Sequence, residues 1–121
     1  METKTNKSAI VRGGEFLIKD SSWEDTYIPE QINEEQQMMR NMGRDFVKNE
    51  IDANLEALEK DPMLGVGVLD KAGELGLLSL SIPEEYGGLG KDITTTSYVS
   101  EILGGGHGVS VALGAHVGIG T

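Results

Sequence analysis

The stretch Ile82-Pro83-Glu84-Glu85-Tyr86-Gly87-Gly88-Leu89-Gly90 is the most informative part of this sequence. Pro83 fixes an extended entry into the segment, because its ring restricts the backbone. Gly87 and Gly88 permit backbone angles that are closed to other residues. The segment is therefore predicted to be a turn that links two ordered elements.

Helices are predicted on both sides of this turn. Before it, Asp61-Pro62 starts a helix with Asp as cap and Pro in the first helical position, and Gly76 ends it in a left-handed turn. After it, Asp92 caps a helix that Gly104-Gly105-Gly106 breaks. The apolar faces of these helices are expected to comprise Leu64, Val68, Ala72 and Leu75 in the first, and Tyr98, Val99, Ile102 and Leu103 in the second.

Two further helices are predicted, one at each end of this arrangement. Asn33 and Gln36 form a capping-box pattern at the start of an amphipathic helix over residues 33–59, either straight or bent. Its apolar stripe follows helical spacing through Met38, Met39, Met42, Phe46, Ile51, Leu55 and Leu58. The segment from Val109 to Ile119 is apolar on nearly all sides and is too short to span a bilayer, so we expect a buried helix, or the start of one, there.

These elements predict an all-α helical bundle over residues 30–121, preceded by an N-terminal extension over residues 1–29. Residues 1–12 are polar and expected to be frayed, so the extension is partly flexible. Its apolar patch Phe16-Leu17-Ile18 is interpreted as a segment that docks on another surface, which can lie outside this chain.

Composition and charge exclude several classes of function. The 121 residues carry a net charge of -10, and a negative field disfavours binding to nucleic acid or to an anionic membrane. The absence of cysteine excludes thiol catalysis, disulfides and thiolate metal sites. The polar start is unlike a secretory signal, and no apolar run is long enough for a transmembrane helix. A cytoplasmic location is the default expectation.

The residues do not supply a self-sufficient catalytic site. No Gly-x-Gly-x-x-Gly or Walker pattern occurs. His107 and His116 would fall on opposite faces of one helix, which argues against a shared metal, and Ser110 and His116 are similarly separated. His116 is interpreted as a hydrogen-bonded core residue, with a cofactor or substrate contact as the alternative.

The glycine-rich segment near the end of the chain also requires an explanation, because glycine within a helix is unfavourable. Ser110, Gly114 and Gly118 lie four residues apart and share one face of the predicted helix. Small side chains along such a face leave a groove. Either close helix packing or a long apolar ligand could fill it.

Four stretches together resemble the acyl-CoA dehydrogenase family. The strongest is the turn over residues 82–90, which is similar to the family's "vPeeyGGlG" phrase. The others are the "GELGL" phrase in residues 72–78, the helix around Glu101-Ile102-Leu103, and residues 113–120, which resemble the family's "AH...iG" helix. The order and spacing of the four agree with the family, and the resemblance covers residues from about 30 to 121.

The resemblance implies the N-terminal helical domain of a flavin-dependent enzyme, truncated before its β-domain. The complete enzyme would carry FAD and dehydrogenate fatty acyl-CoA between the α- and β-carbons in β-oxidation. It would pass electrons to electron-transfer flavoprotein and form a homo-oligomer. The glutamate that acts as the base in the family lies outside this chain, so we expect no dehydrogenase activity and little or no FAD binding from the chain alone. We also expect the exposed apolar helix to make it self-associate.

The family's helix around residues 109–119 lines the acyl-chain pocket. The resemblance assigns this wall to Ser110, Val111, Gly114, Ala115 and Gly118, with no catalytic or metal-binding residue in the chain. Because Ser110 and Gly114 are small where other members have bulky residues, we expect a long-chain preference, with long-chain members as the nearest relatives. A non-catalytic helical module that binds acyl chains or a partner is the alternative, and an acyl-CoA oxidase would look similar.

Overall fold

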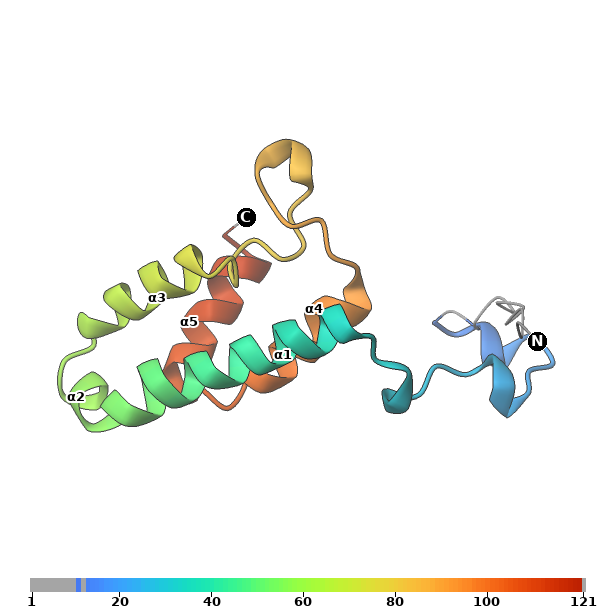
Figure 1. Ribbon diagram of the computed structural model, residues 1–121, viewed down its shortest axis with the longest axis horizontal. Coiled ribbons are helices and arrows are strands. Elements are labelled where there is room, and N and C mark those ends of the chain that lie inside the picture. Colours follow the sequence, from blue (N-terminus) through green and yellow to red (C-terminus); the bar gives the residue numbers. More distant parts are fainter. Residues whose placement is uncertain (1–10, 12, 121) are drawn as a thin grey trace. The chain divides into compact units, whose positions relative to one another are not determined.

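The computed structural model describes residues 11 and 13–120, which fall into two compact units, Met1–Asn33 and Glu34–Thr121. Within the described residues, the regular elements are all helical and no strand is present (Figure 1). The predicted all-α class is therefore confirmed. The described helices also include none that is both long and apolar enough to cross a membrane.

The first unit is built from three short 3-10 helices, Glu15–Leu17, Trp23–Asp25 and Pro29–Gln31. Its loops are tied together at Asp25, whose carbonyl accepts a hydrogen bond from Val11 N at 3.0 Å. The Asp25 carboxylate also accepts a hydrogen bond from Ser22 N at 2.9 Å. Apart from Val11, the frayed segment predicted over residues 1–12 lies outside the described residues.

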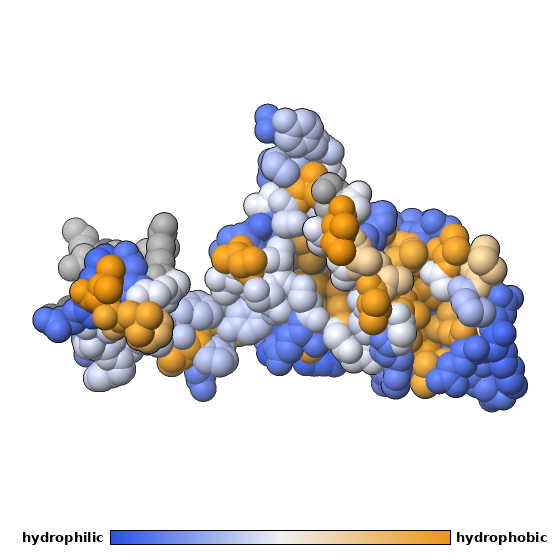
Figure 2. Space-filling model, turned by 180° about the vertical axis from the view of Figure 1, so that it is seen from behind, coloured by the Kyte–Doolittle hydropathy of each residue, from blue (hydrophilic) through white to orange (hydrophobic). Residues whose placement is uncertain are grey.

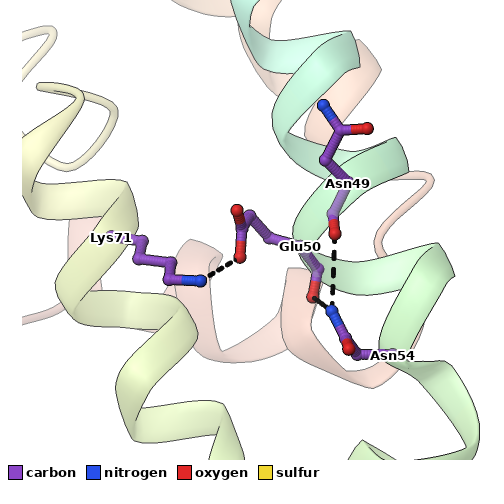
Figure 3. Close-up of polar contacts among 4 residues, drawn as sticks. All are labelled: Asn49, Glu50, Asn54 and Lys71. Carbon is purple, nitrogen blue, oxygen red and sulfur yellow. Dashed lines mark hydrogen bonds and ion pairs between the residues drawn. The ribbon is translucent and has the colours of Figure 1, made fainter.

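The long helix predicted over residues 33–59 is present but changes its hydrogen-bonding pattern along its length. It comprises α1 (Glu34–Phe46), a π-helical turn (Val47–Ile51), a 3-10 turn (Asp52–Asn54) and α2 (Leu55–Lys60). Asn54 Nδ2 donates hydrogen bonds back to the carbonyls of Glu50 at 3.2 Å and Asn49 at 3.4 Å (Figure 3). This side chain therefore satisfies carbonyl groups where the regular helix is interrupted.

Both ends of the next helix follow from local hydrogen bonds. α3 (Leu64–Glu74) begins slightly later than predicted, because Asp61 Oδ1 accepts from Met63 N at 3.0 Å and holds the preceding turn. At the other end, Gly76 has a φ of 76°. Leu77 N donates to Ala72 O at 2.9 Å and Gly76 N to Gly73 O at 2.9 Å, which together form a Schellman motif. The predicted left-handed stop at Gly76 is confirmed.

The turn that follows is closed by backbone hydrogen bonds. Leu89 N donates to Ser79 O at 2.9 Å, and Lys91 N donates to Leu80 O at 2.7 Å. Gly88 passes so close to Ile82 that a Cβ atom there would lie 2.0 Å from the Ile82 carbonyl oxygen. A side chain at this position is therefore incompatible with the loop, which explains the second glycine of the pair.

The last two helices are α4 (Ile93–Leu103) and α5 (His107–Gly118). Asp92 caps α4 as predicted, because its Oδ1 accepts a hydrogen bond from Thr95 N at 2.9 Å. Hydrogen bonds from the Thr95 side chain and backbone lower the pKa of the Asp92 carboxyl. α4 packs along α1 so closely that a Cβ atom at Gly43 of α1 would be in van der Waals contact with Val99 and Ile102.

The core of the helical unit contains residues from α1, the π-helical turn, α3, α4 and α5, together with the segment after α3. Its buried apolar side chains are Phe46, Val47, Ile51, Val68, Ala72, Leu77, Leu80, Val99 and Leu113. Three residues that the predicted apolar faces included are instead exposed, namely Met38, Leu64 and Leu75. The expectation that residues 109–119 form a buried helix is also wrong for this structure, since Leu113 is the buried residue of α5.

Candidate functional site

The position of α5 depends on a tight contact at its start. Gly106 lies so close to the core that a Cβ atom there would come within 2.8 Å of Ile51 Cδ1. His107 then adopts a φ of 53°, an uncommon left-handed value for a residue other than glycine. Ser110 Oγ donates to the carbonyl of His107 at 2.5 Å within the first turn of α5, and it also lies 3.3 Å from the carbonyl oxygen of Gly104 at the end of α4. These contacts orient the faces of α5 relative to the core.

One face of α5 forms a groove with α4 and the segment after α3. Ser110 and Gly114 line it together, as the sequence predicts for two small residues four positions apart. The groove has a volume of about 130 Å³ and is mainly apolar. Its other lining residues include Leu77, Leu80, Thr96, Leu103, Leu113 and Val117. A slender hydrocarbon chain matches this combination of small and apolar side chains.

The remaining predicted site residues lie elsewhere on the helix. Val111, Ala115 and Gly118 are exposed and do not line this groove. The structure thus brings together two of the five predicted residues, whereas Val117 rather than Gly118 continues the groove. Leu113 and Val117 are missing from the predicted set although they are three and seven positions from Ser110, a spacing that places them beside it on a helix.

A second and larger groove, of about 490 Å³, lies between α2, α3 and the first turn of α5. Its apolar lining includes Leu55, Leu58, Leu69, Val109 and Ala112. His107 lies at the groove, and its Nε2 is 3.6 Å from Asp52 Oδ1. Sequence reasoning missed this groove, because its lining residues come from three helices whose relative placement is set by the core.

Neither histidine is buried in this structure. His116 is exposed, so the interpretation of His116 as a core residue is wrong. His107 is exposed, with 52% of its side chain accessible beside Asp52. In the described part of the chain, no group of three or more histidine and acidic side chains could hold a metal ion.

Hydrophobic residues nevertheless gather on the surface of the helical unit (Figure 2). Within α5 and directly after it, Val111 is 75% exposed and Ile119 is 88% exposed. An apolar surface of this kind is unusual for a face that meets only water and points to further packing.

Comparison with known families agrees with the sequence motifs. The model of the acyl-CoA dehydrogenase N-terminal domain matches residues 33–121. The chain belongs to this family. A probable acyl-CoA dehydrogenase of Bacillus subtilis (strain 168) is 36% identical over 113 residues, which are 93% of this chain and 19% of that protein. A solved structure, an acyl-CoA dehydrogenase complexed with FAD from Bacillus anthracis, is 38% identical with a TM-score of 0.82, over 90% of this chain and 19% of that one.

The acyl-CoA dehydrogenases that match the chain are much longer than it and differ in substrate. The chain spans about a fifth of the length of these relatives. They include the short-chain specific acyl-CoA dehydrogenase of Rattus norvegicus mitochondria, which is 34% identical over 63% of this chain and 18% of that protein. The comparisons therefore do not support the expectation that long-chain members are the nearest relatives.

The two grooves along α5 offer no cationic side chain to FAD. FAD carries a pyrophosphate, which proteins bind with cationic side chains or with backbone N–H groups at helix starts. The two grooves along α5 are lined by no lysine or arginine. Both grooves of this acyl-CoA dehydrogenase domain are instead lined mainly by apolar side chains.

Proposed function

We propose that this chain, over residues 30–121, forms the N-terminal helical domain of a flavin-dependent acyl-CoA dehydrogenase. The whole enzyme would remove hydrogen from the α- and β-carbons of a fatty acyl-CoA in β-oxidation. Its proposed setting is a cytoplasmic homo-oligomer that reduces electron-transfer flavoprotein. Family membership supports the enzyme class. The observation that supports a role for this domain is the apolar groove beside Ser110 and Gly114.

The groove is the proposed place for the distal end of the acyl chain. Its walls contact a ligand through methyl and methylene groups, and burial of each ligand CH₂ group there would contribute about 0.8 kcal/mol. Ser110 and Gly114 leave room in the groove beside α5, since neither carries a long side chain. We therefore propose a preference for long acyl chains. The remaining predicted residues, Val111, Ala115 and Gly118, would complete the wall on the exposed face of the same helix.

The test uses the full-length protein that carries this chain, because bleaching of its flavin reports substrate oxidation directly. We expect palmitoyl-CoA to bleach the visible flavin bands at lower concentration than octanoyl-CoA, and butyryl-CoA to be the weakest. The reverse order would overturn the long-chain proposal. If the enzyme has a normal flavin content and none of the three thioesters bleaches its flavin bands, the proposed function itself is overturned.

The variant Gly114→Leu tests the groove. Its side chain would project into open space in the described structure and fill part of the groove, so the helix can accept it. We expect KM to rise at least tenfold for palmitoyl-CoA while that for butyryl-CoA changes little. Gly67→Leu is a matched control, because Gly67 is also an exposed helical glycine with open space around it, on α3. Equal effects of the two substitutions would contradict the assignment of the groove.

A further inference from the structure

The start of α5 rests on one side chain of the π-helical turn. A Cβ atom at Gly106 would lie 2.8 Å from Ile51 Cδ1, so the glycine backbone packs directly on this methyl group. Ile51 is fully buried, at 0% exposure, and Gly106 is buried as well. The next residues of the two segments are also neighbours, since His107 Nε2 lies 3.6 Å from Asp52 Oδ1. The π-helical turn is therefore the support on which α5 begins.

Backbone hydrogen bonds connect Gly106 to both neighbouring helices. Its N–H donates to Leu103 O at 2.9 Å, at the end of α4. Its carbonyl accepts from Val109 N at 3.1 Å and from Ser110 N at 3.3 Å, in the first turn of α5. Val109 lines the larger groove and Ser110 lines the smaller one. A displacement of Gly106 is therefore passed on to residues of both grooves.

The distance of α5 from the core determines the width of the smaller groove. Leu77 and Leu80, which line this groove, belong to the core, whereas α5 contributes Ser110 and Gly114. The groove thus lies between α5 and core side chains. A start of α5 farther from the core widens it, and a start closer to the core narrows it. Because protein cores are close-packed, one methyl group at the contact with Ile51 is enough to move the helix.

We propose that Ile51 is a positioning residue for acyl-chain length, because it holds Gly106, and with it α5, at a fixed distance from the core. Ile51 is fully buried and lies outside the lining of both grooves, so it acts through Gly106. This inference rests on the proposed function, since it takes the groove beside Ser110 and Gly114 to receive the distal end of an acyl chain.

Two substitutions change the contact by one methyl group in opposite directions. Ile51→Val removes Cδ1, the atom that Gly106 approaches, so α5 can settle closer to the core. Gly106→Ala adds a Cβ atom where only 2.8 Å is available, so the start of α5 must move outward. The double variant transfers the methyl group from one side of the contact to the other, and cores tolerate such volume-conserving changes best. Its remaining close approach is 3.1 Å, to the Leu103 carbonyl oxygen.

Flavin bleaching of the full-length protein by a series of saturated acyl-CoA thioesters, from butyryl-CoA to stearoyl-CoA, tests the proposal. We expect the chain length with the lowest KM to become shorter in Ile51→Val and longer in Gly106→Ala, and to return toward the wild-type length in the double variant. The effects should be larger on KM than on kcat. Since each CH₂ group in apolar contact corresponds to about a fourfold change in affinity, a shift of about two carbon atoms is measurable.

Gly105→Ala is the matched control. A Cβ atom there would meet only the Ile102 carbonyl oxygen, at 3.4 Å, and Gly105 lies outside the lining of both grooves. We expect this variant to keep the wild-type optimum. A shift equal to that of Gly106→Ala would overturn the assignment of the contact to Ile51.

A purely structural role for Ile51 gives a different pattern. An unchanged optimum, or shifts in the same direction in both single variants, would overturn the positioning role. If Gly106→Ala does not fold, the double variant must still favour longer chains than Ile51→Val does, and equal optima would overturn the proposal. Wild type tests the proposed function separately. If none of the thioesters bleaches its flavin, the proposed function fails, whereas bleaching with unchanged optima in the variants overturns the positioning role alone.

Discussion

Gln36 Nε2 donates a hydrogen bond to Thr95 Oγ1 at 3.0 Å across the contact between α1 and α4, although the residues are 59 positions apart. Both are buried, at 7% and 5% exposure. Thr95 also hydrogen-bonds the Asp92 carboxyl through its side chain and backbone. The first turn of α1 is thereby connected to the cap of α4 through a single buried hydroxyl.

Thr95→Val is expected to destabilise the domain by about 1–3 kcal/mol, because it removes a buried hydroxyl on which Gln36 and Asp92 both depend. Valine has nearly the shape of threonine, so packing changes little. Urea unfolding of Thr95→Val, Gln36→Leu and the double variant measures the coupling between the two side chains. Strict additivity of the two single effects would contradict a direct interaction.

Because of Asp92, the stability of the domain is expected to decrease as the pH falls in the acidic range. Its folded-state pKa is lowered, chiefly by the Thr95 side-chain hydrogen bond, so the ionised form contributes stability above the unfolded-state value of about 3.8. That contribution is lost as pH falls through the lowered folded-state pKa. Asp92→Asn keeps a capping oxygen but does not titrate. The free energy of unfolding is measured from pH 6 downward at roughly unit steps. The stability difference between wild type and Asp92→Asn should shrink as the pH falls.

Two glycine substitutions are expected to change stability in opposite directions. Gly88→Ala would place a Cβ atom 2.0 Å from the Ile82 carbonyl oxygen, so it should destabilise the domain by more than about 1 kcal/mol. Gly67→Ala meets nothing within 4 Å on α3 and should stabilise it by about 0.5–1 kcal/mol. Thermal unfolding of both variants checks the prediction, and a neutral Gly88→Ala would contradict the described loop.

The 121-residue chain is expected to self-associate through the exposed face of α5. Val111→Lys adds a charge to that face and should shift the association to higher protein concentration in sedimentation velocity experiments. Ser97→Lys adds the same charge to an exposed position on α4 and serves as the control. If both variants behave like wild type, association through α5 is excluded as the cause.

Sequence reasoning was accurate where structure depends on neighbouring residues. The Asp92 cap and the left-handed stop at Gly76 each require only hydrogen bonds within a few positions, and the structure contains both. Which face of α5 is buried could not be predicted in the same way, because nearly every position on this helix is apolar or small. Its orientation depends on the contact of Gly106 with Ile51, which is distant in sequence and visible only in the fold.

The same dependence on distant contacts explains why the lining of the groove beside Ser110 was predicted only in part. A spacing of four residues correctly placed Ser110 and Gly114 side by side, but it could not show that Val111 and Ala115 turn away from α4. Met38, Leu64 and Leu75 follow helical periodicity yet remain exposed. Periodicity identifies a candidate apolar face, whereas burial requires a partner element that reaches it.

The π-helical turn at Val47–Ile51 has a consequence for how this domain can change in length. Five residues of a regular α-helix turn through about 500°, which would separate Phe46 and Ile51 by roughly 140°, yet both are buried at 3% and 0% exposure. The π-helical turn winds less per residue and so returns Ile51 to the side of Phe46. If one residue were deleted here, the remaining four would wind about 400° as regular α-helix, so the helix beyond would keep nearly the same face toward the core. The turn is thus the point in this helix where one residue can be gained or lost without re-aiming the walls of the larger groove.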